Sequence, residues 1–194
     1  DPKYGGKIFI DGKEVNIKSP EDAIKAGIAL ITEDRKTQGL FLDHPLDINV
    51  TIANLRRFMN KKSRLIDLQA LKEETKKYIK ELKIKADRID MNVRFLSGGN
   101  QQKVVIAKWL CTNAKVFIFD EPTRGIDVGA KVEVYRLMND LVEQGKIVIM
   151  ISSELPEIFG MCDRVLVMNE GSITANFPIE EATQESIMKA ATGV

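Results

Sequence analysis

The sequence has few of the residues that cross-link proteins or anchor them in membranes. Its two cysteines, Cys111 and Cys162, are far apart and fit no disulfide, metal-binding or redox spacing, so we expect reduced, packed thiols of the kind found in cytosolic proteins. The longest apolar run, residues 147–151, is far too short to span a bilayer, and the N-terminus lacks the apolar core of a signal peptide. Any membrane role must therefore come through a partner.

An excess of charge of one sign is also absent. The chain has 29 Lys and Arg side chains against 28 Asp and Glu, a net charge of +1. This balance provides no positively charged surface field that would attract nucleic acid, so we expect no nucleic-acid partner. The sequence also has no acidic tail that would bind a basic protein. Hydrophobic residues are plentiful at 44%, which excludes wholesale disorder, and the 194 residues suit one domain with an inserted subdomain.

In the first half of the chain, the predicted secondary structure changes from mainly strands to helices near residue 46. Residues of about 1–45 predict a β-hairpin turning at Asp11 and Gly12, a short helix that begins at Ser19 and ends at Gly27, and a strand over 28–31. Over about 46–96 the strand patterns vanish, and residues 67–82 carry apolar side chains, Leu68 among them, at helical spacing. This second stretch therefore reads as a helical subdomain.

The second half, about 97–194, alternates between helical and strand patterns. We expect a helix from Ser97, buried strands over 116–119 and 147–151 with a helix over 128–144 between them, a short helix capped by Ser153, two strands over 164–168 and 172–177, and a last helix near Thr183. Continuous apolar strands that alternate with helices are typical of a parallel sheet covered on both faces. The expected fold class is therefore α/β.

The first chemical pattern is a pair of carboxylates at the end of a predicted strand. Asp120 and Glu121 follow directly on the apolar run at 116–119. At the carboxyl end of a buried strand, Asp120 is placed to reach a hydrated Mg²⁺, and Glu121 is placed to polarise an attacking water. A strand that simply ends in a polar turn accounts for these residues equally well, so this pattern alone leaves both interpretations open.

The second pattern, Ser97-Gly98-Gly99-Asn100, opens a helix upstream of that strand. Two glycines let backbone N–H groups approach an anion closely, the serine adds a hydroxyl, and a helix N-terminus favours negative charge. The plain alternative is an ordinary serine-capped helix start. The carboxylate pair that follows favours the phosphate-binding interpretation.

Together these residues resemble the motifs of ABC transporter ATPases. Residues 96–102 resemble the signature loop, 120–123 the end of the Walker B strand, and 125–127 the D-loop. Longer strings at 33–36, 100–103, 123–129 and 152–154 are similar to bacterial importers of ribose, galactose and xylose, which carry two ATPase domains in one polypeptide, and the chain resembles the second, C-terminal one. The resemblance implies an incomplete P-loop NTPase fold, a parallel sheet with helices on both faces, plus the helical subdomain and a small antiparallel β portion.

The sequence departs from the family pattern in three places. It contains no G-x-x-x-x-G-K-[ST] string, the phosphate-cradling loop that the family places just before the hairpin at Lys7, so we expect the chain to begin after that loop and to be inactive alone. The family's Q-loop glutamine falls on Glu33, and its switch histidine falls on Ser153. The single histidine, His44, lies beside a proline, and we expect it on the surface.

The resemblance implies a division of roles, because ABC ATPases hold ATP between the P-loop of one domain and the signature loop of another. This chain would offer its signature loop to ATP on a partner domain, bind Mg²⁺ through Asp120 and use Glu121 as the catalytic carboxylate of its own weak or inactive site. The nucleotide-contacting residues implied are Ser97, Gly98, Gly99, Asn100, Gln101, Glu33, Asp127 and Ser153.

The implied partners are a second ABC ATPase domain and an integral membrane sugar permease, reached by the helical subdomain and the Glu33–Lys36 loop at the cytoplasmic face of the plasma membrane. A solvated helix pair and a solvated loop are the plain alternatives. The function expected is ATP-driven sugar import; a non-hydrolysing scaffold or regulatory fragment is the alternative. A soluble ATPase of translation or DNA repair is disfavoured by the balanced charge. We also expect the isolated chain to be marginally stable or to associate.

Overall fold

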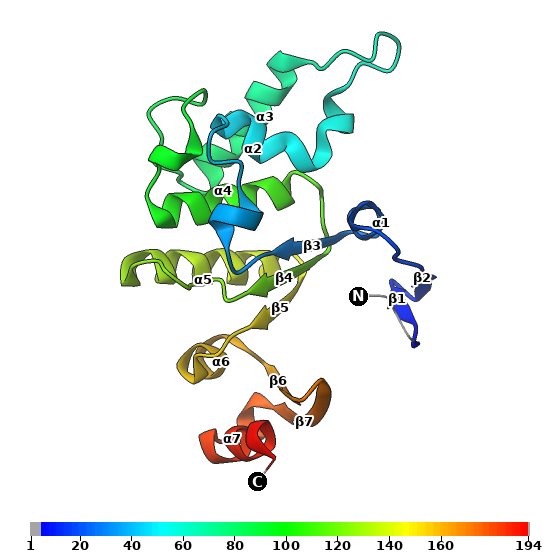
Figure 1. The fold of residues 1–194 in the computed structure, drawn as a ribbon, viewed down its shortest axis with the longest axis vertical. Coiled ribbons are helices and arrows are strands. Elements are labelled where there is room, and N and C mark those ends of the chain that lie inside the picture. Colours follow the sequence, from blue (N-terminus) through cyan, green and yellow to red (C-terminus); the bar gives the residue numbers. More distant parts are fainter. Residues whose placement is uncertain (1–4, 194) are drawn as a thin grey trace. The chain divides into compact units, whose positions relative to one another are not determined.

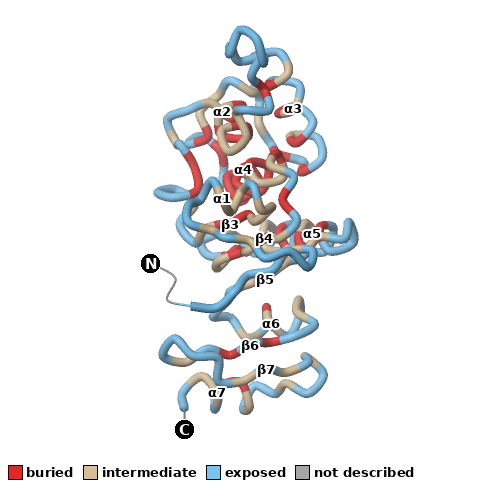
Figure 2. The backbone as a smooth tube through the Cα atoms, turned by 90° about the vertical axis from the view of Figure 1, so that its right-hand side faces the viewer, coloured by how far each residue is buried: buried red, intermediate tan, exposed pale blue. Residues whose placement is uncertain are grey.

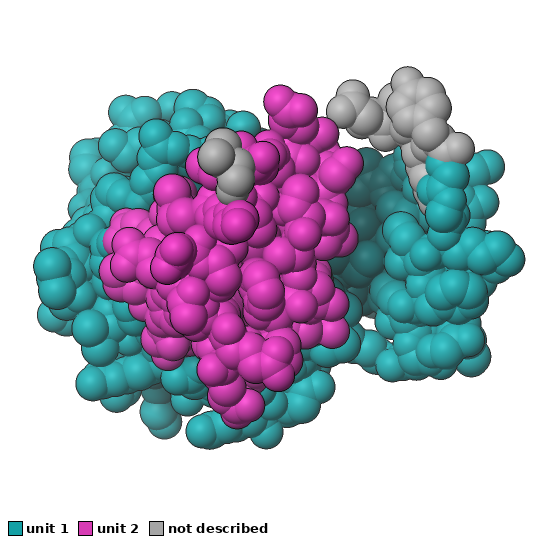
Figure 3. Space-filling view, turned by 90° about the horizontal axis from the view of Figure 1, so that it is seen from below, with its two compact units in different colours: residues 1–149 teal, residues 150–194 magenta. Residues whose placement is uncertain are grey.

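The computed structural model describes residues 5–193 and divides into two compact units, Asp1–Ile149 and Met150–Val194 (Figure 3). Residues 1–4, on which the expected absence of a signal peptide partly rests, and Val194 lie outside the described residues. No helix within 5–193 combines the length and the apolar character that crossing a membrane requires.

A small sheet forms the base of the first unit. Strands β3 (Ile28–Ile31) and β4 (Val116–Asp120) pair in parallel, with Ile28 opposite Val116, and β5 (Ile147–Ile151) lies on the other side of β4 (Figure 1). Parallel strands separated by long helical connections confirm the predicted α/β class. The carboxyl end of the central strand therefore carries Asp120.

The core of the first unit lies between this sheet and helix α4 (Gly98–Leu110), which contacts β3. Phe117 and Phe119 of β4 are fully buried and stack at 6.5 Å between ring centroids. Residues on nearly every side of α4 are buried, and buried stretches gather in this helix and the elements around it (Figure 2). Helix α5 (Val128–Glu143) contacts α4. An almost wholly buried helix holds its first turn rigidly.

Between β3 and α4 the chain is helical, as predicted. It forms α2 (Leu46–Thr51), the 3₁₀ turn η2 (Ile52–Phe58), α3 (Leu68–Glu81) and the 3₁₀ turn η3 (Val93–Phe95). Helix α3 buries Leu71, Thr75 and Tyr78 of its predicted apolar stripe, and α2 contacts both α3 and α4. Leu68 was expected on this stripe but is exposed, because it occupies the first helical position, ahead of the packed turns.

The elements before β3 follow local rules of turn and cap chemistry. The hairpin of β1 (Ile8–Ile10) and β2 (Lys13–Val15) turns through Asp11 and Gly12, both with positive φ, as a two-residue hairpin turn requires. Helix α1 (Pro20–Lys25) is capped by the Ser19 side chain. Both predictions are confirmed.

The second unit contains α6 (Leu155–Met161), β6 (Arg164–Asn169), β7 (Ser172–Pro178), the 3₁₀ turn η4 (Ile179–Glu181) and α7 (Gln184–Thr192). The two strands form the predicted antiparallel hairpin. Helix α7, capped by Thr183, covers one face of it, and Val165, Val167 and Ile187 form the small core. This unit therefore has a hydrophobic cluster of its own.

The expected burial of β5 is wrong. Its alternate side chains Ile147, Ile149 and Ile151 are 57%, 47% and 49% exposed. The strand is the last of its three-stranded sheet, so within residues 5–149 one edge has no neighbouring strand. A continuous apolar run indicates that a strand can be covered on both faces, but it does not determine that both faces are covered.

We expect this strand to make the isolated chain associate, because an apolar edge strand is a template for pairing. Ile149→Lys should shift the 194-residue chain from associated species towards monomer in size-exclusion chromatography with light scattering. Val142→Thr removes an equally exposed apolar side chain from α5 and should leave the distribution unchanged. A wild-type chain that stays monomeric as its concentration rises would contradict this expectation.

Candidate functional site

The turn Ser97–Asn100, here the Ser97 turn, presents a hydroxyl at the start of α4. Ser97 is exposed, and its Oγ accepts hydrogen bonds from the backbone N (3.5 Å) and the Nδ2 (2.8 Å) of Asn100. Asn100 is oriented in turn because its Oδ1 accepts from Lys85 N at 2.8 Å. A serine hydroxyl has two acceptor positions and one donor, so the O–H remains to donate to a ligand.

The two glycines of the turn have a packing role that sequence did not indicate. A Cβ on Gly99 would lie 2.7 Å from the Ala130 Cβ of α5, and a Cβ on Gly98 would lie 2.8 Å from Nη2 of Arg35. Any side chain at either position must therefore displace a neighbour. Their N–H groups belong to the first helical turn, which leaves them outside the helix's own hydrogen-bond ladder.

Gln101, predicted to contact phosphate, is instead turned inward. Its side chain is only 5% exposed, and its Nε2 donates to Val93 O at 3.2 Å. Its backbone N donates to Ser97 O at 2.8 Å, within the helix. In this structure the Gln101 side chain is therefore held against η3 and is not exposed beside Ser97.

The loop Asp120–Asp127, here the carboxylate loop, follows β4. Asp120 is half-buried at the strand end, and Glu121 has a left-handed backbone (φ +45°), which costs a residue with a Cβ about 1–2 kcal/mol. Arg124 N donates to Glu121 O at 3.1 Å and closes a turn. Asp127 caps α5 by accepting from Ala130 N at 2.9 Å. Strained backbone of this kind is concentrated at functional sites.

The carboxylate loop can supply part of a magnesium site. Within residues 5–193 no group of three or more His, Cys, Asp or Glu side chains is arranged to hold a metal ion. Mg²⁺ is commonly bound through one or two carboxylates, with waters and substrate phosphates completing its shell. The half-buried Asp120 and the adjacent Glu121 fit that incomplete donor set.

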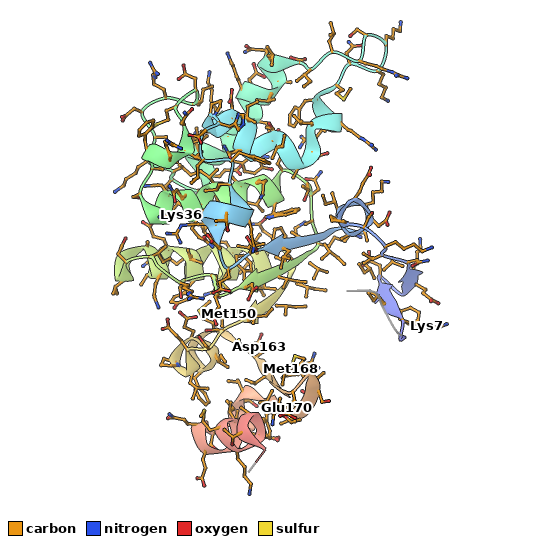
Figure 4. All side chains as sticks on the ribbon, in the orientation of Figure 1. Lys7, Lys36, Met150, Asp163, Met168 and Glu170 are labelled. Atoms are coloured by element: carbon orange, nitrogen blue, oxygen red, sulfur yellow. The ribbon has the colours of Figure 1, made fainter. Side chains whose placement is uncertain are left out.

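A third segment, Arg35–Gly39, here the π-turn, reaches both loops. Asp34 caps it by accepting from Lys36 N (2.9 Å), Thr37 N (3.2 Å) and Thr37 Oγ1 (2.7 Å), and these bonds hold the pKa of the Asp34 carboxyl below its usual value. Figure 4 labels Lys36 on this turn. Glu33, just before it, forms an ion pair with Arg124 of the carboxylate loop.

The other end of the π-turn is held by a buried lysine. Lys108, in the last turn of α4, is 8% exposed, and its Nζ donates to Gly39 O at 2.6 Å. Burial lowers the pKa of Lys108 from 10.5 to about 8, because a charged ammonium is costly to desolvate. The folded protein therefore prefers the neutral amine more than the unfolded chain does.

We expect this lysine to make stability rise with pH between about 8 and 10.5. Below pH 8 Lys108 is charged in both the folded and the unfolded state, so the folded protein bears the full cost of desolvating it. Above pH 10.5 Lys108 is neutral in both states, and that cost is gone. The free energy of unfolding therefore rises by roughly 3 kcal/mol between pH 8 and 10.5. Urea unfolding of wild type and Lys108→Met across this range measures the difference between them. Burial raises the pKa of Cys111 to about 11, which acts oppositely, but both proteins retain that thiol. Parallel pH profiles would contradict the expectation.

The two remaining residues considered in the sequence are Ser153 and His44. Ser153 belongs to the second unit and was expected to cap α6, but the helix begins after Glu154, and the hydroxyl of Ser152 accepts from Glu154 N (3.0 Å) and donates to Glu157 (2.8 Å). The predicted serine cap is therefore wrong, because Glu154 occupies the N-cap position and no side chain caps α6. His44 is exposed, as predicted, and packs edge-on against Phe41.

A family model described as "ABC transporter" matches residues 1–124, a range that contains the Ser97 turn and the start of the carboxylate loop. The chain belongs to the ABC transporter family. Its relatives include the xylose import ATP-binding protein XylG of Thermoanaerobacter pseudethanolicus, 56% identical over 188 residues, and the ribose import ATP-binding protein RbsA of Oceanobacillus iheyensis, 54% identical over 188 residues. Each alignment covers 97% of this chain but only 37% and 38% of the relative.

Solved structures of ABC transporter ATP-binding proteins share the fold. The ATP-binding cassette MJ1267 superposes with a TM-score of 0.76 at 22% identity, covering 96% of this chain and 77% of that one. The cbiO1 protein of Clostridium perfringens, part of the transporter complex cbiONQ, gives a TM-score of 0.72 at 23% identity over 95% and 70% of the two chains. These similarities confirm the ABC ATPase fold.

Of the two residues that hold the π-turn of this ABC transporter chain, the sequence pattern placed Arg35 only within the 33–36 string and did not single out Lys108. Their bonding partners, Gly125 and Gly39, are 90 and 69 residues away in the chain. Only the resemblance of residues 33–36 to family strings pointed towards the π-turn, and it did not indicate a contact.

Proposed function

We propose that this chain is an ATP-binding domain of a sugar-importing ABC transporter, and that its Ser97 turn contacts the terminal phosphate of ATP held by a partner ATPase domain. The chain spans less than two fifths of the length of the xylose and ribose import proteins it matches. The observation that carries the proposal is the exposed Ser97 hydroxyl, whose acceptor positions are both filled from within the turn.

The Ser97 turn would act through hydrogen-bond donors fixed in advance. The Ser97 O–H and the backbone N–H groups of Gly98 and Gly99 would donate to phosphate oxygens, and Asn100 would orient the hydroxyl. Donors held in place before reaction stabilise the charge that develops in a transition state, and removal of one such donor typically costs about 3–4 kcal/mol. The buried body of α4 supplies the required rigidity.

The carboxylate loop would serve the site on this chain's own surface. When bound, ATP would supply the phosphoryl group that is transferred, and Mg²⁺ would neutralise the negative charge of the phosphates. Asp120 would hold the metal with its waters, and Glu121 would accept a proton from the attacking water. Glu33, Asp127 and Ser153 would line the nucleotide. We expect this site to be weak or inactive in the chain alone, since the sequence contains no phosphate-cradling string.

The permease contact would lie on the helical subdomain at about 46–96 and on the Glu33–Lys36 loop, with the chain peripheral to the cytoplasmic face of the plasma membrane. Phe41 and Phe95 support this surface, since they are 53% and 73% exposed. The backbone joins their segments, because Arg94 N donates to Leu42 O at 3.2 Å. Exposed aromatic side chains are typical of protein-binding surfaces.

The second candidate is a scaffold that hydrolyses nothing, and it differs from the first in what it predicts for a mixture with a partner domain. Phosphate release would be measured for the chain alone, for a partner ATPase domain that contains a P-loop, and for their mixture with the permease. Hydrolysis that appears or increases strongly only in the mixture supports the proposed function. A mixture no more active than the partner alone would identify the scaffold.

A further inference from the structure

The π-turn holds Arg35 on a fixed base. Asp34 accepts three bonds at the start of the turn, and Gly39 N donates back to Asp34 O at 3.3 Å, across five residues. At the far end, Gly39 O accepts from Lys108, and a Cβ on Gly39 would lie only 3.1 Å from Cγ2 of Val105. The turn is therefore seated on α4, which also carries the Ser97 turn at its start. Single π-turns of this kind are often found at functional sites.

From this base the Arg35 guanidinium reaches two carbonyls of the carboxylate loop. Its Nη1 donates to Arg124 O and its Nη2 donates to Gly125 O, each at 3.1 Å. Gly125 has a φ of +67°, so the carbonyls are presented by a backbone conformation that favours glycine. A planar fork that donates to two successive carbonyls fixes both the position and the orientation of the loop.

The same guanidinium also lies against the Ser97 turn. A Cβ on Gly98 would lie 2.8 Å from Nη2 of Arg35 and 3.5 Å from Gly125 O. Three segments that are distant in the chain thus meet at one side chain. The Nε of Arg35 is buried and has no hydrogen-bond partner among the described residues, so the side chain tolerates an unpaired donor to keep this position.

We infer that Arg35 is a positioning residue that sets the spacing between the Ser97 turn and the carboxylate loop. This inference rests on the proposed function, in which both segments face nucleotide. Arg35 acts through the carbonyls of Arg124 and Gly125 and through contact with Gly98. Because Glu121 and Asp127 flank those carbonyls, a shift of the loop moves both carboxylates relative to Ser97. A lysine ammonium cannot replace the fork, because it presents a single point of charge.

The first test uses the complete ATPase assembled with its permease. Arg35→Gln and Arg35→Lys should each lower kcat for ATP hydrolysis about 10- to 100-fold while KM for ATP changes little. Misplaced reacting groups weaken stabilisation of the transition state more than they weaken the binding of ATP. Arg88→Gln, which removes a guanidinium from an exposed ion pair with Asp90, is the matched control and should keep wild-type kinetics. Wild-type kcat in Arg35→Lys would overturn the role of the fork.

The second test is a double-mutant cycle. Gly98→Ala should lower kcat in the presence of Arg35, because the new methyl group meets the guanidinium. In the Arg35→Ala background the space is open, so adding Gly98→Ala should lower kcat by less than about twofold further. Equal effects of Gly98→Ala in both backgrounds would show that the Arg35 contact is not the cause, and would overturn the inference.

A readout without nucleotide separates this inference from the proposed function. Hydrogen exchange of the complete ATPase should show faster exchange over residues 121–127 in Arg35→Gln than in wild type or Arg88→Gln. Unchanged exchange there overturns the positioning role, whatever the kinetics. Faster exchange together with kinetically silent substitutions at Ser97 supports the positioning role and rejects the proposed phosphate contact.

Discussion

Replacement of Ser97 by Asp is expected to lower ATP hydrolysis by the assembled transporter about 100-fold or more. Aspartate is as good a helix cap as serine, so α4 should keep its start. Its carboxylate, however, has no proton to donate at neutral pH and repels a phosphate where the serine O–H would donate to it. Steady-state phosphate release and sugar uptake by proteoliposomes measure the effect.

Ser97→Asn is the matched control for this prediction. It is also a good cap, it adds no charge, and its amide can donate a hydrogen bond, so we expect activity within about tenfold of wild type. If Ser97 serves only as a helix cap, the Asp and Asn variants should behave alike. Equal and near-normal turnover by both would reject the phosphate contact.

Gly99→Ala is expected to destabilise the protein by about 1–3 kcal/mol, the usual cost of overpacking a filled site. The added methyl group would lie 2.7 Å from the Cβ of Ala130, so either α4 or α5 must move. Ala130→Gly in the same chain removes the opposing methyl group and should recover most of the loss. Urea unfolding of the single and double variants measures the coupling.

Gly160→Ala provides the control for the intrinsic effect of a methyl group on a helix. Apart from the adjacent residues and the helix's own backbone, no atom lies within 4 Å of a Cβ at Gly160 in α6, so this substitution should stabilise by about 0.5–1 kcal/mol through the unfolded chain. If Gly99→Ala and Gly160→Ala shift the unfolding free energy in the same direction, close packing against Ala130 is not the reason for glycine at position 99.

Elements governed by neighbours in the chain could be predicted from sequence. The caps at Ser19 and Ser97 and the start of the last helix near Thr183 are confirmed, because a cap depends on a side chain and an N–H only two or three residues away. The parallel strands and the carboxylates at the end of β4 follow from apolar runs and their spacing. The ABC transporter resemblance was carried by such short strings.

Features that depend on distant partners could not be predicted in this way. The inward orientation of Gln101 depends on η3, the packing of Gly99 depends on α5, and the contact of Arg35 depends on a loop about 90 residues away. Burial of β5 depends on which elements cover the sheet, and the apolar pattern of a strand does not predict those elements. Apolar periodicity indicates which side chains can be buried, whereas tertiary neighbours decide which ones are.

The attachment of the π-turn at both of its ends has a mechanical consequence. Lys108 ties one end to the last turn of α4, and Arg35 ties the other to the carboxylate loop. Between them, Lys36, Thr37 and Gln38 are exposed. Displacement of these three residues by a neighbouring protein would therefore pull on the Arg35 guanidinium and change the spacing between Ser97 and Glu121.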